Sequence, residues 1–200
     1  MRFRTFLTYL TLLPLSACTR SCNDYDNNEE FSRAQLPPYT ETGANTLGCV
    51  LGAQTWTVLG KYDSGQGFGR WQPNGLTAYA GSYAGNLQLR LGGRMTGARN
   101  SKEFYDTEIG LTFRLADTLG RLRLLGADTA RSSSQTEFMG ATNFIDNRDF
   151  KSSARRPVRL LIRKLDQQQR TVSGTFSGML YENRGPDSLA VADGRFDVHY

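Results

Sequence analysis

The residues with side chains suited to acid–base or metal chemistry are few and scattered. The chain has 200 residues and a single histidine, His199, next to its last residue. Its carboxylate pairs include Asp106 with Glu108 and Asp146 with Asp149. A hydrolase triad or a zinc site would need His199 beside partners that the sequence does not place near it. Neighbouring carboxylates could hydrolyse a glycoside, but in loops they more often cap turns. We therefore expect no catalytic residue, no metal site and no cofactor, and no enzymatic activity.

A glycine-rich stretch holds the best candidates for ligand binding. Three glycines lie at alternate positions between 65 and 69, without the lysine and following helix of a phosphate-binding loop. Phe68, Arg70 and Trp71 lie beside them. An aromatic ring next to a guanidinium suits stacking on a sugar or gripping an anion. The alternative is that Phe68 or Trp71 folds back onto the core. We take Phe68, Arg70 and Trp71 as candidate ligand-binding residues.

The start of the chain has the pattern of a secretory signal. Arg2 and Arg4 precede an eleven-residue, mostly apolar run, 5–15, which is too short to cross a bilayer as a helix. The following Leu15-Ser16-Ala17-Cys18 resembles the lipobox of bacterial lipoproteins. The resemblance implies a signal peptide over residues 1–17, cleavage before Cys18 and lipid attachment to Cys18. Several acyl chains would anchor the protein to a membrane almost permanently.

Residues 18–45 are predicted to form a flexible tether. The stretch 23–30 is polar and acidic and has no apolar periodicity, so we expect it to lack structure. An acidic patch soon after a lipidated cysteine resembles the surface-export signals of Bacteroidota lipoproteins. The expected location is the outer membrane, on its periplasmic or cell-surface side.

Two further cysteines lie in a compartment where disulfides persist. A bridge between Cys22 and Cys49 would fasten the tether to the first strand. The alternative is a free Cys22 and a Cys49 buried as a small strand residue, because Cys49 lies within an apolar strand pattern. We expect the second arrangement, without a bridge.

The remaining chain, 46–200, is basic and glycine-rich. Its 20 Lys or Arg residues exceed its 14 Asp or Glu residues by six. Arginine could meet phosphate or carboxylate groups, or lie on solvent-facing strands, which we favour. Nucleic acid is not an expected partner outside the cytoplasm. The chain has 21 glycines, which suits an all-β domain with many tight turns.

Period-two alternation predicts the strands. It is clear over Leu87–Arg94 and Ile109–Leu115, and we expect a Gly52-Ala53 hairpin turn between strands over 47–51 and 54–59. A strand over 76–83 pairs with 87–94, weaker strands cover 120–125 and 136–145, and 60–75 is expected to be a loop. Three strands after residue 158 predict an antiparallel meander that ends the chain. The predicted fold is all-β: one antiparallel sandwich or barrel-like domain of nine or ten strands over 46–200.

Four segments resemble one protein family. The segments 42–49, 162–166, 173–176 and 193–198 (Thr-Gly-Ala-Asn-Thr-Leu-Gly-Cys, Ile-Arg-Lys-Leu-Asp, Ser-Gly-Thr-Phe and Asp-Gly-Arg-Phe-Asp-Val) are similar to uncharacterised single-domain lipoproteins of Bacteroidota. That family usually has Asn-Gly-Lys in the first hairpin turn, where this chain has Leu51-Gly52-Ala53. The resemblance implies a fold and a location, since the family has no assigned activity.

The expected function is therefore a non-enzymatic binding module of the cell envelope. Its partner would be a glycan, a small solute or an envelope protein. The alternative is a structural or assembly component of the envelope. An internal apolar pocket with converging polar groups would favour the binding module, and a flat exposed apolar edge would favour the assembly role.

Overall fold

Alternating apolar residues build one curled antiparallel sheet. The computed structural model describes residues 34–63, 71–83, 86–100, 103–115, 119–126 and 137–200. Within them are thirteen strands and no helix: β1 Thr46–Leu51, β2 Gln54–Thr57, β3 Lys61–Asp63, β4 Trp71–Pro73, β5 Thr77–Tyr83, β6 Asn86–Asn100, β7 Glu103–Arg114, β8 Leu122–Leu125, β9 Phe138–Asn143, β10 Arg148–Lys151, β11 Val158–Asp166, β12 Thr171–Glu182 and β13 Ser188–His199. Accordingly, no helix in this described part could span a membrane.

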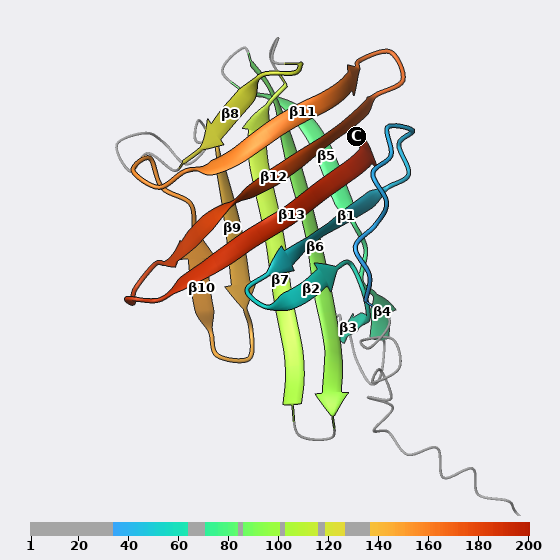
Figure 1. Ribbon diagram of the computed structural model, residues 1–200. Helices are drawn as coiled ribbons and strands as arrows, with labels where there is room; N and C mark the ends of the chain where they lie inside the picture. Colours follow the sequence, from blue (N-terminus) through green and yellow to red (C-terminus); the bar gives the residue numbers. More distant parts are fainter. Residues whose placement is uncertain (1–33, 64–70, 84–85, 101–102, 116–118, 127–136) are drawn as a thin grey trace, which may run out of the picture.

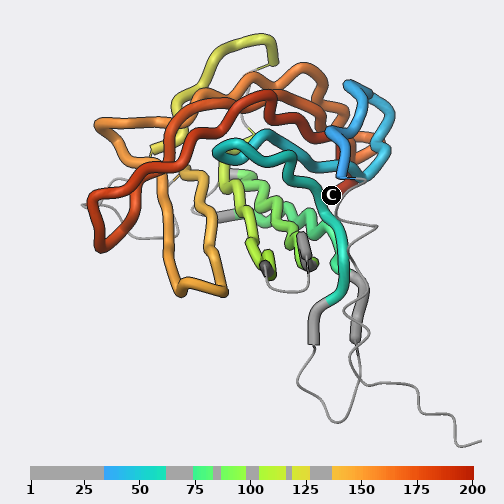
Figure 2. Tube along the Cα trace, turned by 60° about the horizontal axis from the view of Figure 1, so that its bottom comes forward, coloured from blue at the N-terminus to red at the C-terminus, as the bar shows by residue number. Residues whose placement is uncertain are grey.

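The sheet divides at β12. One edge of β12 pairs with β13, and the other pairs first with β11 and then, near its end, with β10. The strand order β2-β1-β13-β12-β10-β9-β7-β6-β5 therefore bends back on itself, while β11 carries β8 on a side branch. In Figure 1, β11, β12, β13 and β1 cross in front of β6, β7 and β9. Figure 2 shows the resulting half-barrel.

A β-bulge keeps both halves of β13 directed at the core. At this point two residues of β13 lie opposite one residue of β1 and one of β12, and Asp193 has a φ of 50°. Val191 is buried before the bulge, and Phe196 and Val198 are buried after it. Without the extra residue the alternation would turn one of these halves outward.

The core lies between the two halves of the curled sheet. The Phe196 ring lies 5.8 Å from that of Phe113, across the two halves, and 6.4 Å from that of Phe176. Trp56 is fully buried, and its indole N–H donates to the Thr107 carbonyl oxygen at 3.2 Å. Gly93 permits this packing, because a Cβ there would lie 2.4 Å from a Val58 methyl carbon.

The segment 34–45, here called the strap, lies along β13 although it has no regular structure. Asp197 fastens it. The Asp197 carboxylate accepts hydrogen bonds from the Thr40 hydroxyl at 2.6 Å and from the backbone N–H groups of Thr42, Gly43 and Ala44 at 2.9, 2.8 and 3.1 Å. These residues, which the sequence analysis assigns to the tether, are therefore in contact with the domain.

Several sequence predictions are confirmed and others need correction. The all-β antiparallel fold, the C-terminal meander and the first hairpin are as predicted, and Gly52 has the positive φ, 63°, that its turn requires. The expected nine or ten strands are too few. The predicted loop 60–75 contains β3 and β4, which pair with each other, and β10 was not predicted at all. These strands have only three or four residues, too short to show a period.

Candidate functional site

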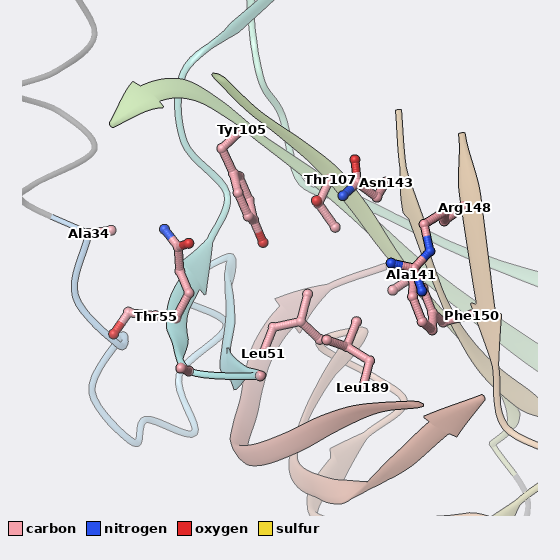
Figure 3. A pocket seen from close by; sticks show the side chains of 13 residues that line it. Ala34, Leu51, Thr55, Tyr105, Thr107, Ala141, Asn143, Arg148, Phe150 and Leu189 are labelled. Atoms are coloured by element: carbon pink, nitrogen blue, oxygen red, sulfur yellow. The ribbon is translucent and has the colours of Figure 1, made fainter. Parts of the chain in front are cut away.

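A cavity of about 660 Å³ opens between the two halves of the sheet. Its walls come from the β1–β2 hairpin, the first half of β7, the end of β9, the starts of β10 and β13, and the first described residue of the strap. Figure 3 shows side chains from these separate elements around one space. The lining residues are Ala34, Leu51, Gly52, Ala53, Gln54, Thr55, Tyr105, Thr107, Ala141, Asn143, Arg148, Phe150 and Leu189.

Much of the lining is apolar. Leu51, Ala141 and Phe150 are buried members of the core cluster, and Leu189 packs against that cluster. Each occupies an inward position of its strand, so the cavity continues the core toward solvent. Its volume is within the usual range for small-molecule pockets, roughly 300–1,000 Å³.

Tyr105 and Thr107 supply the polar groups of the β7 wall. They extend the inward alternation of Ile109, Leu111 and Phe113 toward the start of the strand. Burial raises the pKa of Tyr105 to about 12, although its hydrogen bond with the Thr107 side chain favours a lower pKa. Tyr105 therefore stays a neutral phenol at physiological pH. In Figure 3 its ring extends from β7 into the space.

Arg148 closes the opposite side of the cavity and is neutralised there. Its Nε and Nη2 donate to the two Glu182 carboxylate oxygens at 2.9 and 3.1 Å, and Nη2 also contacts Asp187. Its guanidinium carbon lies 5.0 Å from the centre of the Phe150 ring. The hydrogen bonds with Glu182 and Asp187 raise the pKa of Arg148, and that with Arg148 lowers the pKa of Glu182. The cavity thus presents no uncompensated cation at Arg148.

Asn143 shapes the rim through the β9–β10 turn. Its side-chain oxygen accepts from the backbone N–H of Ile145 at 2.9 Å, and its amide donates to Asp146 at 3.1 Å. This Asx-type turn joins β9 to β10 and places Arg148 opposite Asn143. Asp146 is therefore a turn residue, and Asp149 accepts from the Thr142 hydroxyl at 2.8 Å.

The site residues singled out in the sequence lie mostly outside the described residues. Phe68, Arg70 and the lipid-attachment residue Cys18 lie outside them. Trp71 begins β4, where its backbone pairs with that of Asp63 in the two-stranded β3–β4 sheet.

The candidate acid–base residues do not converge. His199 is exposed at the end of β13, and its backbone N–H donates to Asn45. Asp106 binds Arg94 through both carboxylate oxygens, at 2.7 and 2.6 Å. No group of three or more His, Cys, Asp or Glu side chains in the described ranges could hold a metal ion.

Cys49 is buried in β1 and carries a free thiol, the arrangement expected for it. Burial raises the pKa of this thiol to about 12. The other partner of the bridge considered above, Cys22, lies outside the described residues.

Comparisons of the chain with known protein families, curated proteins and solved structures gave no match. The site therefore rests on its own geometry. Sequence reasoning missed all of its lining residues as site residues. Tyr105 and Thr107 could have been found by extending the Ile109–Leu115 alternation backward, whereas nothing local marks Arg148 as a partner of Glu182.

Proposed function

We propose that this protein is a lipid-anchored envelope lipoprotein whose β domain binds a small, uncharged and largely apolar molecule in the 660 Å³ cavity. The anchor is Cys18, and the location is the outer membrane, on its periplasmic or cell-surface side. The module acts by binding, without catalysis.

The cavity is the observation that carries this proposal. Its apolar lining favours a ligand that loses little hydration on entry. Hydrogen-bonding groups that can fix the orientation of a ligand come from the Tyr105–Thr107 pair and from the side chains of Gln54 and Thr55. Because two carboxylates pair with Arg148, an anionic ligand gains nothing from this arginine. A neutral molecule with one polar end suits these features best.

The test uses the uncharged fluorophore N-phenyl-1-naphthylamine, whose emission rises in apolar surroundings. Leu189→Trp fills the cavity, so we expect loss of the fluorescence gain with an unchanged fold by circular dichroism. Leu124→Trp is the matched control, because Leu124 is 59% exposed on β8 and lies outside the cavity. Equal binding by parent and Leu189→Trp would refute a cavity site.

The anchor is tested separately by the intact mass of protein extracted from membranes. We expect loss of residues 1–17 and added acyl mass, both abolished by Cys18→Ser. A soluble mature chain without acyl mass would contradict the anchor while leaving the cavity untouched.

One observation favours the assembly role as a second candidate. Leu119, Leu122 and Leu124 are all more than half exposed, and β8 pairs only with β11 among the described strands. An edge strand with exposed leucines can pair with another protein. If this role holds, Leu122→Glu combined with Leu124→Glu will abolish cross-linking to envelope proteins without affecting fluorophore binding.

A further inference from the structure

The strap encloses a second, smaller cavity of about 160 Å³. Tyr39 and Glu41 line it from the strap, Arg163 from β11, Ser173 from β12 and Arg195 from β13. Ser173 alternates with the inward Val172 and Gly174, so it faces the outer side of the sheet. The large cavity lies between the two halves of the sheet and shares no lining residue with this one.

The Ser173 hydroxyl is buried and lacks a hydrogen-bond partner in the described part of the chain. The residue is 2% exposed, and its Oγ has no hydrogen-bond partner among the described residues. Buried polar groups are nearly always paired, so an orphaned hydroxyl that lines a cavity points to a missing partner there.

Two arginines converge on the same space. Arg163 is the extra residue of a bulge in β11, since Ile162 pairs with Gly174 and Lys164 with Ser173. A bulge of this kind redirects a side chain. The guanidinium carbons of Arg163 and Arg195 lie 5.9 and 4.0 Å from the centre of the Tyr39 ring. The ring therefore holds both guanidiniums beside the strap.

Neither arginine is neutralised within the described part of the chain. No carboxylate there forms an ion pair with Arg163 or Arg195. Arg195 Nε donates to the backbone oxygen of Asp193 at 3.2 Å, and Nη1 donates to that of Pro37 at 3.1 Å. Its Nη2 is left to donate to a ligand. The Asp197 carboxylate is hydrogen-bonded by the strap, and Glu41, which lines the cavity, forms no ion pair with a described residue.

We propose that this strap cavity binds a small oxyanion, a carboxylate or phosphate group. Arg163 and Arg195 would donate charge-assisted hydrogen bonds to its oxygens, and the Ser173 hydroxyl would donate a third. The volume suits one such group rather than a whole large ligand. This inference does not depend on the function proposed for the large cavity.

The test is an NMR titration of the full-length protein with sodium phosphate and, in parallel, sodium acetate, each against sodium chloride at equal ionic strength. We expect saturable shifts of the strap amides with at least one of the two anions, and the tighter anion identifies the preferred group. Arg163→Gln and Ser173→Ala should each raise the Kd about tenfold, the size of one charge-assisted hydrogen bond.

Arg159→Gln is the matched control, because Arg159 is exposed on the same strand but does not line the cavity. It should leave the Kd unchanged. An equal loss of affinity in Arg159→Gln would show binding to diffuse positive charge and overturn the site. No saturable shift beyond that of chloride would also overturn it. A Ser173→Ala protein of higher stability and unchanged Kd would remove Ser173 from the site, since its hydroxyl would then be only an unsatisfied group.

Discussion

Replacing Asp197 with asparagine tests how the strap is held. Asp197 is 2% exposed, and its carboxylate accepts from the Thr40 and Thr42 hydroxyls, the second at a longer 3.4 Å, and from three backbone N–H groups. An asparagine keeps one oxygen, so its amide must face at least one backbone donor, and the remaining bonds lose their charge. Hydrogen bonds to charged groups contribute roughly 1 kcal/mol more than neutral ones, and a lost bond costs about 1–3 kcal/mol. Because the strap is partly solvated, we expect Asp197→Asn to lower the free energy of unfolding by about 3 kcal/mol, taking the low end of these costs.

For a domain of this size that corresponds to a fall in Tm of roughly 6–12 °C by differential scanning calorimetry. Asp193→Asn is the control, because Asp193 is exposed on the same strand and asparagine tolerates its positive φ. An Asp197→Asn protein that melts within a degree or two of the parent would refute the role of this carboxylate.

The pH dependence gives a second check. Burial works to raise the pKa of Asp197, but the hydrogen bonds from Thr40 and from the N–H groups of Ala44, Thr42 and Gly43 outweigh it and lower the pKa. A lowered folded-state pKa contributes stability above the unfolded value of about 3.9, and this contribution is lost as pH falls through the folded value. The difference in Tm between parent and Asp197→Asn should therefore be constant near neutral pH and shrink below about pH 4.

Three further predictions concern the core. Phe196→Ala should cost about 3–5 kcal/mol by chemical denaturation, since Phe196 is buried between two other rings; an unchanged denaturation midpoint would contradict this packing. Gly93→Ala should lower the free energy of unfolding by about 1–2 kcal/mol, because its Cβ would meet Val58. Gly110→Ala should be neutral or stabilising, because its Cβ would have no neighbour closer than 3.8 Å. Equal changes in the two variants would contradict the close approach at Gly93. Cys49 should react with a thiol reagent at pH 8 only as fast as the protein unfolds, because its side chain is fully buried and burial also raises its thiol pKa to about 12. Peptide mapping of the labelled site measures this, and rapid labelling of Cys49 would show it exposed.

The strands that the sequence predicted well are those with a long apolar period. Ile109–Leu115 and the strands after Val158 alternate over enough residues to define both an element and its inward face. The alternation did not predict the bulge at Asp193, because one extra residue shifts which face of the strand points inward without changing the composition. The strap was not predicted either, because its polar residues resemble a linker. Only the fold brings the Asp197 carboxylate to the N–H groups of the strap.

The candidate site could be predicted even less than the strands, because it is formed by strands that lie far apart in the sequence. The cavity joins Leu51, Tyr105, Arg148 and Leu189, which lie on four strands that sequence alone does not order in space. The sequence pattern indicated a different candidate, Trp71 beside Arg70 in a glycine-rich stretch, and that stays a prediction. Residue type identified a plausible contact, whereas the curvature of the sheet determined where a cavity formed.

The central claim is that the large cavity holds a small molecule. Native mass spectrometry of the protein, purified under mild conditions from cells that naturally produce it, tests this most directly, with Leu189→Trp and Leu124→Trp prepared in the same way. We predict that the parent and Leu124→Trp carry one small uncharged molecule that is released on denaturation, and that Leu189→Trp carries none. A parent protein with only the mass of its own chain and anchor, or a bound molecule retained by Leu189→Trp, would contradict the claim.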